Sequence, residues 1–565
     1  MGEKTALNTQ RWLAGLVALG LGLAASSGWA QSQLPAAAEP GTLQRDFINR
    51  QDQAAPGPKT VTPPTPQVNA PAGAEKLKLN LTGITLSGNT VFTDRQLAEL
   101  YTPLLGQTIT LAEVYGIAQR ITQKYQEAGY ILSVATLPPQ EVEGGVVQIK
   151  ITEAYVADLQ VVGENLSPTL LEKFRIRAQA ENPLRKETVE ELMLLLGNLP
   201  GASVTPVLIP GGAPGAVRLE VAMTVQPYQL QAGVGNRGSR FTGPFRQNAS
   251  VTFNNLPHFA SLRLAAETAL PHTELKMYSL AYTLPLDAYG NSLELGGVMT
   301  RAVPGFTLTP LEVESESETF HLRWQGFGAL TADFSSRWQL TLEHTGATST
   351  ILGALNADDD LRVVEVAWSA HQRQSSGAQT LGRVALRQGL DIFGASEAGD
   401  AALSRQAGRP DFTSLKFDLQ HWQPLALPGW GLLWGLTGQY AGAQLLASEE
   451  FSWGGGAFGR AYDVAEFTGD HGLGTSLELS YTQPTDGQGY HQVFAFADLG
   501  AAWKINTNQL NDRKSAMSAG LGWRAQWNQH LSSQLELAKP LTRPSSHATL
   551  EADSARVFLG VRYQY

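Results

Sequence analysis

The residues with the clearest chemical potential lie in one glycine-rich, aromatic segment toward the end of the chain. Between about Leu445 and Leu473 the sequence includes EEFSWGGGAFGRAYD over residues 449–463. This segment is too long for a tight hairpin and too apolar for a flexible surface loop. Arg460 lies among four aromatic side chains that favour burial. A desolvated guanidinium is costly without an acidic partner, so the chemistry expected here is an ion pair.

Asp498 is the candidate partner of Arg460. It follows a strand-like run in which Phe494, Phe496 and Asp498 share one parity. Either all three side chains face inward together, or the strand bends near Asp498. The alternative for Arg460 is an exposed loop position that pairs with nothing.

Patterns for enzymatic chemistry are absent from the sequence. It contains no G-x-S-x-G elbow, no H-E-x-x-H motif and no Walker loop, and its 10 His residues are scattered. The glycines at 454–456 follow no strand-to-helix transition, which disfavours a phosphate-binding loop. The chain has no Cys, and its net charge of −10 comes without a basic stripe, which argues against nucleic acid. We therefore expect no enzyme, no cofactor and no metal site.

The first thirty residues predict an export signal. Lys4 and Arg11 precede an apolar run from Trp12 to Ala25, and small residues around Ala30 suit cleavage before Gln31. The alternative is a retained membrane anchor, but the apolar run falls short of the roughly 20 residues that a spanning helix needs. Residues 1–30 are expected to be a signal peptide.

Alternation of apolar and polar residues dominates the chain from Tyr228 onward. In the last segment Val557, Leu559 and Val561 point one way and Phe558 the other. Sixteen such segments begin near residues 228, 246, 261, 275, 292, 318, 335, 361, 379, 412, 430, 473, 489, 515, 530 and 556. Each has about 10 residues, the length of a tilted strand that crosses a bilayer.

This pattern predicts that residues 227–565 form a 16-stranded antiparallel transmembrane β-barrel in outer-membrane lipid. An even number of strands closes such a barrel without an edge, which lipid requires because unpaired backbone groups are costly there. The alternative is a soluble β-sandwich or propeller. The apolar or aromatic face of each segment argues against that alternative.

The residues before the barrel divide into three parts. Residues 31–75 combine a possible short helix, Gly41 to Gln53, with a proline-rich linker. Residues 76–153 and 154–226 each suggest a strand, two helices and two strands, so the fold class is α+β modules followed by an all-β barrel. In the first module we expect a strand over 77–86 and a short helix with Asp94 as its N-cap.

With this organisation the chain resembles the transporters of two-partner secretion, the hemolysin secretion/activation (TpsB) family named after ShlB, FhaC and HecB. Three motifs support the resemblance: Leu86-Ser87-Gly88-Asn89, the NRGSRFTG run at 236–243, and the glycines at 454–456 that lead to Arg460. The resemblance implies that residues 76–153 and 154–226 are two tandem POTRA domains in the periplasm.

The resemblance also assigns roles within the glycine-rich loop. In the family an arginine of a V-R-G-[FY] motif meets an acid on a neighbouring inward strand, and here Arg460, Tyr462 and Asp498 match those positions. Gly459 stands where the family often has Val, and Ala461 where it usually has Gly. We expect the exchange at Ala461 to restrict the loop tip if a positive φ is needed there.

The implied function is secretion of a large adhesin or hemolysin whose N-terminal secretion domain binds the POTRA domains. The Gly41–Gln53 helix would plug the pore, folding outside the cell would drive export without ATP, and the barrel would be a monomer inserted by the barrel-assembly machinery. One alternative is a factor that itself assembles outer-membrane proteins. Another is a passive porin, which would have no need of residues 76–225.

Overall fold

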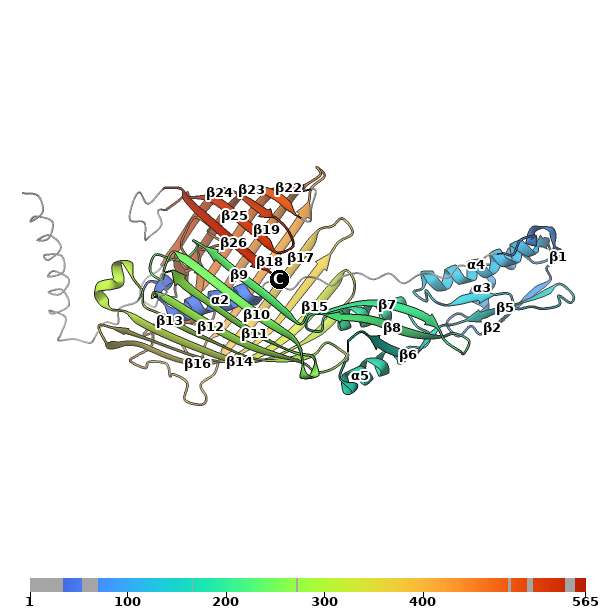
Figure 1. Ribbon diagram of the computed structural model, residues 1–565, viewed down its shortest axis with the longest axis horizontal. Coiled ribbons are helices and arrows are strands. Elements are labelled where there is room, and N and C mark those ends of the chain that lie inside the picture. Colours follow the sequence, from blue (N-terminus) through green and yellow to red (C-terminus); the bar gives the residue numbers. More distant parts are fainter. Residues whose placement is uncertain are drawn as a thin grey trace, which may run out of the picture.

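The computed structural model of the chain describes residues 34–52, 70–164, 166–270, 273–485, 489–505, 512–543 and 554–565. The expected signal peptide and most of the proline-rich linker lie outside these residues. Figure 1 shows a barrel, an elongated pair of α+β modules beside one end of it, and helix α2 inside it. Among the described residues, no helix has both the length and the hydropathy needed to span a membrane.

Within the described residues, sixteen antiparallel strands close into one barrel, as predicted. The strands are β9 (Tyr228–Gly235), β10 (Phe245–Leu256), β11 (Ala260–Leu270), β12 (Leu275–Pro285), β13 (Ser292–Ala302), β14 (Glu314–Leu330), β15 (Phe334–Ile351), β16 (Ala354–Arg373), β17 (Gln379–Gly389), β18 (Thr413–Pro424), β19 (Trp430–Ala441), β22 (His471–Pro484), β23 (Tyr490–Trp503), β24 (Arg513–Gln526), β25 (Leu531–Pro540) and β26 (Arg556–Gln564). The last strand pairs with the first, so Tyr563 lies opposite Ala232.

The strands have the alternation that the sequence predicts. On β26, Val557 and Leu559 are 52% and 56% exposed, whereas Phe558 is 4% exposed and faces the interior. The expected uniform length of about ten residues is wrong for β14, β15 and β16, which have 17, 18 and 20 residues. The additional strand residues include exposed acids such as Glu314 and Asp358, which do not fit in hydrocarbon, so these hairpins extend beyond the membrane.

The first module contains two small sheets and one long helix. Its elements are β1 (Lys78–Asn80), β2 (Gly83–Ser87), α3 (Asp94–Ala98), η3 (Thr102–Leu104), β3 (Thr108–Thr110), α4 (Leu111–Glu127), β4 (Val134–Thr136) and β5 (Val146–Thr152). The single strand expected over 77–86 is divided, because β1 pairs with β3 while β2 pairs with β5, and Leu81 between them turns into the core. The N-cap of α3 is Thr93 rather than Asp94, since its side chain accepts from the Gln96 amide.

The second module repeats the order strand, helix, helix, strand, strand. Its elements are β6 (Tyr155–Val162), α5 (Pro168–Gln179), α6 (Lys186–Gly197), β7 (Ala202–Pro210) and β8 (Ala216–Val225). The sheet order β6-β8-β7 matches β2-β5-β4, and in both sheets the first strand is parallel to the central one.

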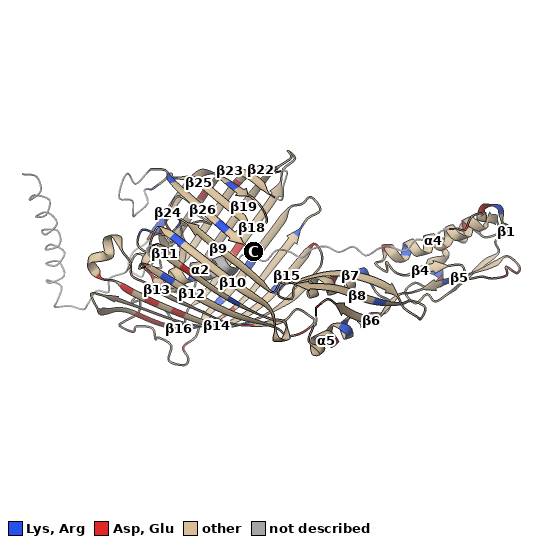
Figure 2. Ribbon diagram, viewed as in Figure 1, with Lys and Arg blue, Asp and Glu red and all other residues tan. Residues whose placement is uncertain are grey.

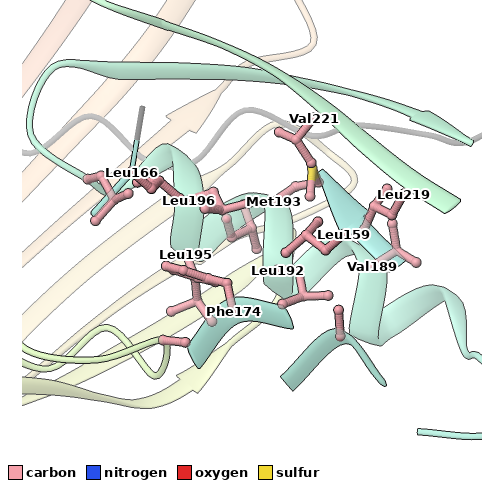
Figure 3. Close-up of a cluster of buried hydrophobic side chains, with 14 of the residues drawn as sticks. Leu159, Leu166, Phe174, Val189, Leu192, Met193, Leu195, Leu196, Leu219 and Val221 are labelled. Atoms are coloured by element: carbon pink, nitrogen blue, oxygen red, sulfur yellow. The ribbon is translucent and has the colours of Figure 1, made fainter. Parts of the chain in front are cut away.

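The core of the second module also anchors it to the barrel. Phe174, Leu192 and Leu219 lie close together between the helices and the sheet (Figure 3). The same apolar cluster includes Ala288, from the turn between β12 and β13, and Leu330, at the end of β14. Burial of this shared surface fixes the module against that end of the barrel.

Glu153 gives the first module a testable pH dependence. Its carboxylate accepts hydrogen bonds from the Thr90 hydroxyl, the Tyr125 hydroxyl at 2.7 Å, the Val91 amide at 3.0 Å and the Thr90 amide at 2.7 Å. Burial raises the pKa of Glu153, but these hydrogen bonds outweigh burial and hold the pKa below its ordinary value of 4.5. The stabilisation is therefore present above pH 4.5 and is lost as the pH falls below it.

We predict that Glu153→Gln destabilises the first module at pH 7 and flattens its acid profile. Hydrogen exchange of peptides from residues 77–154, followed from pH 7 to acid, measures both effects on the full chain. Parallel acid profiles for the wild type and the variant would contradict the assignment.

Candidate functional site

The segment between β19 and β22 folds back into the barrel. We call residues 445–470 the inner loop. It contains η6 (Ala447–Glu449), β20 (Phe451–Trp453) and β21 (Phe467–Gly469), and the two strands pair with each other. Trp453 and Tyr462 are each 1% exposed and pack with Phe494 and Phe496 of the barrel wall. Trp453 and Tyr462, for which the sequence predicted burial, are therefore buried in the lumen.

Arg460 lies at the tip of the inner loop and is 4% exposed. Its backbone amide donates to Asp498 Oδ2 at 2.9 Å, and its Nη2 lies 3.0 Å from Asp498 Oδ1. Its Nη1 lies 2.6 Å from Glu478 Oε2, so the guanidinium meets two acids on neighbouring strands. The ring of Phe496 lies under the guanidinium, 3.7 Å from its carbon.

The structure brings together the two residues that sequence parity suggested, and it resolves the geometry of β23. Phe494, Phe496 and Asp498 are all buried on the inner face, and β23 pairs with β22 and β24 without a register shift. Glu478 was missed as a partner. The available signal was its parity with Ser480 in the alternating run of β22, which places an acid on the inward polar face.

The backbone of the tip differs from the expectation at Ala461. The left-handed residue is Gly459, with φ +76°, and Ala461 is not among the residues with positive φ. A Cβ at Gly459 would lie 2.8 Å from the ring of Trp453, so the glycine serves both conformation and packing. The Tyr462 hydroxyl donates to the carbonyls of Met517 at 3.1 Å and Arg543 at 2.9 Å.

Two further arginines hold the tip from either side of the junction between the first and last strands. Arg237, which follows β9, donates to the Arg460 carbonyl at 3.3 Å. Arg556 at the start of β26 donates to the Ala461 carbonyl at 3.0 Å and lies 2.5 Å from Asp463. The tip is therefore fixed to the wall by side chains from several strands.

Helix α2 (Pro40–Asp52) occupies the lumen beside the inner loop (Figure 1). It is close to the Gly41–Gln53 helix expected from the sequence. Leu43 and Phe47 pack on Met277 and Val298 of the wall. Gln44 Nε2 donates to the Val298 carbonyl at 2.7 Å.

A buried ion network connects α2, the inner loop and the wall. Arg45 of α2 lies 3.1 Å from Glu343 on β15 and also pairs with Glu449 of the inner loop. Arg387 on β17 contacts Glu343, Glu365 and Glu449 at 2.8, 2.8 and 3.0 Å. Charged residues are spread over many barrel strands (Figure 2), and no local pattern in the sequence indicates which of them meet in this network.

Comparisons with known proteins agree with this architecture. A family model described as "Haemolysin secretion/activation protein ShlB/FhaC/HecB" matches residues 215–525, and one described as "POTRA domain, ShlB-type" matches residues 79–154. HuxB of Haemophilus influenzae strain KW20, a heme/hemopexin transporter protein, is 21% identical over 498 residues, which cover 84% of this chain and 85% of HuxB. HuxB of strain 86-028NP is 24% identical over 260 residues, 44% of this chain and 45% of that protein.

Solved structures show the same fold. CdiB from Escherichia coli matches with a TM-score of 0.70 at 18% identity, covering 96% of this chain and 100% of CdiB. BamA from Haemophilus ducreyi lacking POTRA domains 1–3 matches with a TM-score of 0.51 at 16% identity, covering 86% and 100%.

A closed barrel with an inward-folded loop and at least one POTRA domain defines the class as an outer-membrane transporter with a periplasmic POTRA region. The chain belongs to the haemolysin secretion/activation protein family ShlB/FhaC/HecB, because that family model matches more than half of it. It is thus a two-partner secretion transporter, and the family match favours protein secretion over assembly of other barrels.

Gly500 on β23 gives a direct test of how the inner loop is seated. A Cβ there would lie 2.0 Å from Trp453 Nε1, whereas a Cβ at Gly560 on β26 would meet nothing within 4 Å. We predict that Gly500→Ala displaces Trp453 and exposes the peptide bond after Arg460 to trypsin. Gly560→Ala is the matched control and should keep the wild-type digestion pattern.

Mass spectrometry of the digest measures cleavage after Arg460. Equal protection of that bond in Gly500→Ala and Gly560→Ala would show that Trp453 does not hold the loop in the lumen.

Proposed function

We propose that this chain exports a large exoprotein of the adhesin or hemolysin type through its barrel, and that α2 and the inner loop close the barrel at rest. The family match supports export, and one observation carries the proposed closure: Glu449 of the inner loop and Arg45 of α2 belong to the same buried ion network. Both elements are attached to the wall by side chains, so both can leave without breaking the barrel ladder. A barrel of sixteen strands without them has room for an aqueous channel.

Arg460, Tyr462 and Asp498 act in this proposal as a clamp on the inner loop. Removing one member of a buried ion pair leaves an uncompensated charge, which typically costs about 3–5 kcal/mol. Glu478 and Asp498 together neutralise the Arg460 charge, since both contact its guanidinium. The clamp therefore favours one position of the loop tip, with Gly459 supplying the turn that Arg460 requires.

The periplasmic modules would capture the exoprotein by its N-terminal secretion domain. An extended segment can add to a free sheet edge through backbone hydrogen bonds. The sheet of the second module has the edge strands β6 and β7, and β7 contains Pro206 and Pro210 and therefore lacks two donors. The edge strand β2 of the first module contains no proline, so we place strand addition there, with the groove beside α4 as the alternative.

We also propose the following organisation. Residues 1–30 direct export, residues 31–75 form the plug helix and its linker, 76–153 and 154–226 are two POTRA domains, and 227–565 form the barrel. The repeated topology of the two modules supports the second POTRA domain. The barrel-assembly machinery would insert the chain, which would work as a monomer.

A charge exchange tests the clamp within this function. Arg460→Ala should lower the amount of partner at the cell surface by about tenfold or more, the effect of a lost buried charge pair. Glu478 also contacts Arg460, so the exchange of Arg460→Asp with Asp498→Arg is made in a Glu478→Gln background, where it should restore secretion. Arg301→Ala is the control, because Arg301 is an exposed partner of Glu314 and Glu316.

Surface immunoblots of the co-expressed partner measure the result, and cells without this chain give the baseline. Wild-type secretion by Arg460→Ala would contradict the proposed role of Arg460 as a clamp. If the partner exoprotein reaches the surface of cells that lack this chain, the proposed secretion function is contradicted.

A further inference from the structure

We propose that Arg405 is a positioning residue for the inner loop. Its guanidinium lies between two carboxylates that would otherwise repel each other, and it thereby keeps the neck of the loop closed. The proposal rests on the gating role given to the inner loop above. Arg405 lies between β17 and β18 and contacts neither Arg460 nor Asp498. It would act on the tip only through the neck.

The neck is a short antiparallel ladder with an acid at the same end of each strand. In β20 and β21, Phe451 lies opposite Gly469 and Trp453 lies opposite Phe467. One residue beyond this ladder are Glu450 on one side and Asp470 on the other. Like charges at opposed positions destabilise an antiparallel pair, so this end of the ladder requires a cation.

Arg405 supplies that cation. Its Nη1 and Nη2 lie 2.6 and 3.2 Å from the two carboxylate oxygens of Asp470, and Nη1 lies 2.9 Å from Glu450 Oε1. Arg405, Glu450 and Asp470 are all almost completely buried, which strengthens both the attraction and the repulsion. One guanidinium therefore lies within ion-pair distance of both acids at this end of the neck.

The same carboxylate ties the neck to the backbone. Asp470 Oδ1 accepts from the Leu445 amide at 2.7 Å, and Oδ2 accepts from the Ile505 amide at 2.7 Å. Arg405 Nη1 donates to the Leu445 carbonyl at 2.7 Å. Lys504 lies 3.5 Å from Glu450 and is a second but more distant cation.

The segment that carries Arg405 is itself fixed before it meets the loop. Ser404 Oγ lies 2.5 Å from Asp359 Oδ2 and accepts from the Ala447 amide at 3.0 Å. Leu403 and Phe412 pack against the start of the inner loop in one apolar cluster. The backbone that carries Arg405 is thus held in a defined position beside the neck.

Neutralising the acids distinguishes this role from simple packing. In Arg405→Ala, amides of residues 451–469 should exchange with deuterium about tenfold faster or more, the size expected for loss of a buried charge pair. Adding Glu450→Gln and Asp470→Asn to Arg405→Ala removes the repulsion, so exchange should return toward the wild-type rate. Arg405→Lys keeps the charge but not the fork, and should have a smaller effect than Arg405→Ala.

Arg409→Ala is the matched control, because Arg409 belongs to the same segment and forms an exposed ion pair with Asp411. The full chain is used in detergent, and exchange in residues 77–154 reports on overall integrity. Wild-type exchange in Arg405→Ala would overturn the proposal. Fast exchange that the two neutral substitutions do not reduce would also overturn it, because it would mean that Arg405 acts by packing.

If Arg405→Ala does not assemble, Arg405→Lys with and without the two neutral substitutions carries the same test. The readout does not depend on secretion. A loosened loop with unchanged export would contradict the proposed gating function and leave the role of Arg405 intact.

Discussion

The closed state that we propose for this transporter depends on the pairing of charged side chains that the barrel buries. Taking a guanidinium or a carboxylate out of water costs several kcal/mol, and a partner with good geometry must offset that cost. Arg387, Arg405 and Arg460 each meet acids from two or more elements. Each arginine therefore ties the inner loop to the wall or to a neighbouring segment, and the Arg387 network includes α2 as well.

The same constraint explains how a closed barrel can also open. A buried ion network is costly to break one partner at a time, yet as a whole it differs little in free energy from the same groups in water. When α2 and the inner loop leave the lumen together, the charges on both elements gain solvent. The lumen can therefore hold one closed arrangement without making it irreversible, which suits a channel that must admit an unfolded chain.

Local features of the fold could be predicted from the sequence, since alternation and aromatic spacing are properties of each segment. Alternation predicts the positions of the sixteen strands to within a few residues. The exceptions are the long strands β14 to β16, whose additional residues lie outside the membrane. The single strand expected over 77–86 was wrong because Leu81 is recruited to a core that local sequence does not reveal. The parity of Asp498 with Phe494 and Phe496 made it a candidate partner of Arg460. That prediction was possible because parity is a property of a single strand.

Contacts between distant segments could not be predicted in the same way. Arg387 and Arg405 are ordinary polar residues within their own strand or loop, and only closure of the barrel brings them to their partners. Their roles depend on how several strands and loops are arranged relative to one another, which no single segment encodes.

Single-channel recording in planar bilayers tests most directly whether α2 takes part in closing the pore. The full chain should show a small conductance and rare openings. A chain without residues 34–52 should show a larger conductance and more frequent openings. Equal traces from the two proteins would contradict the closed state described here.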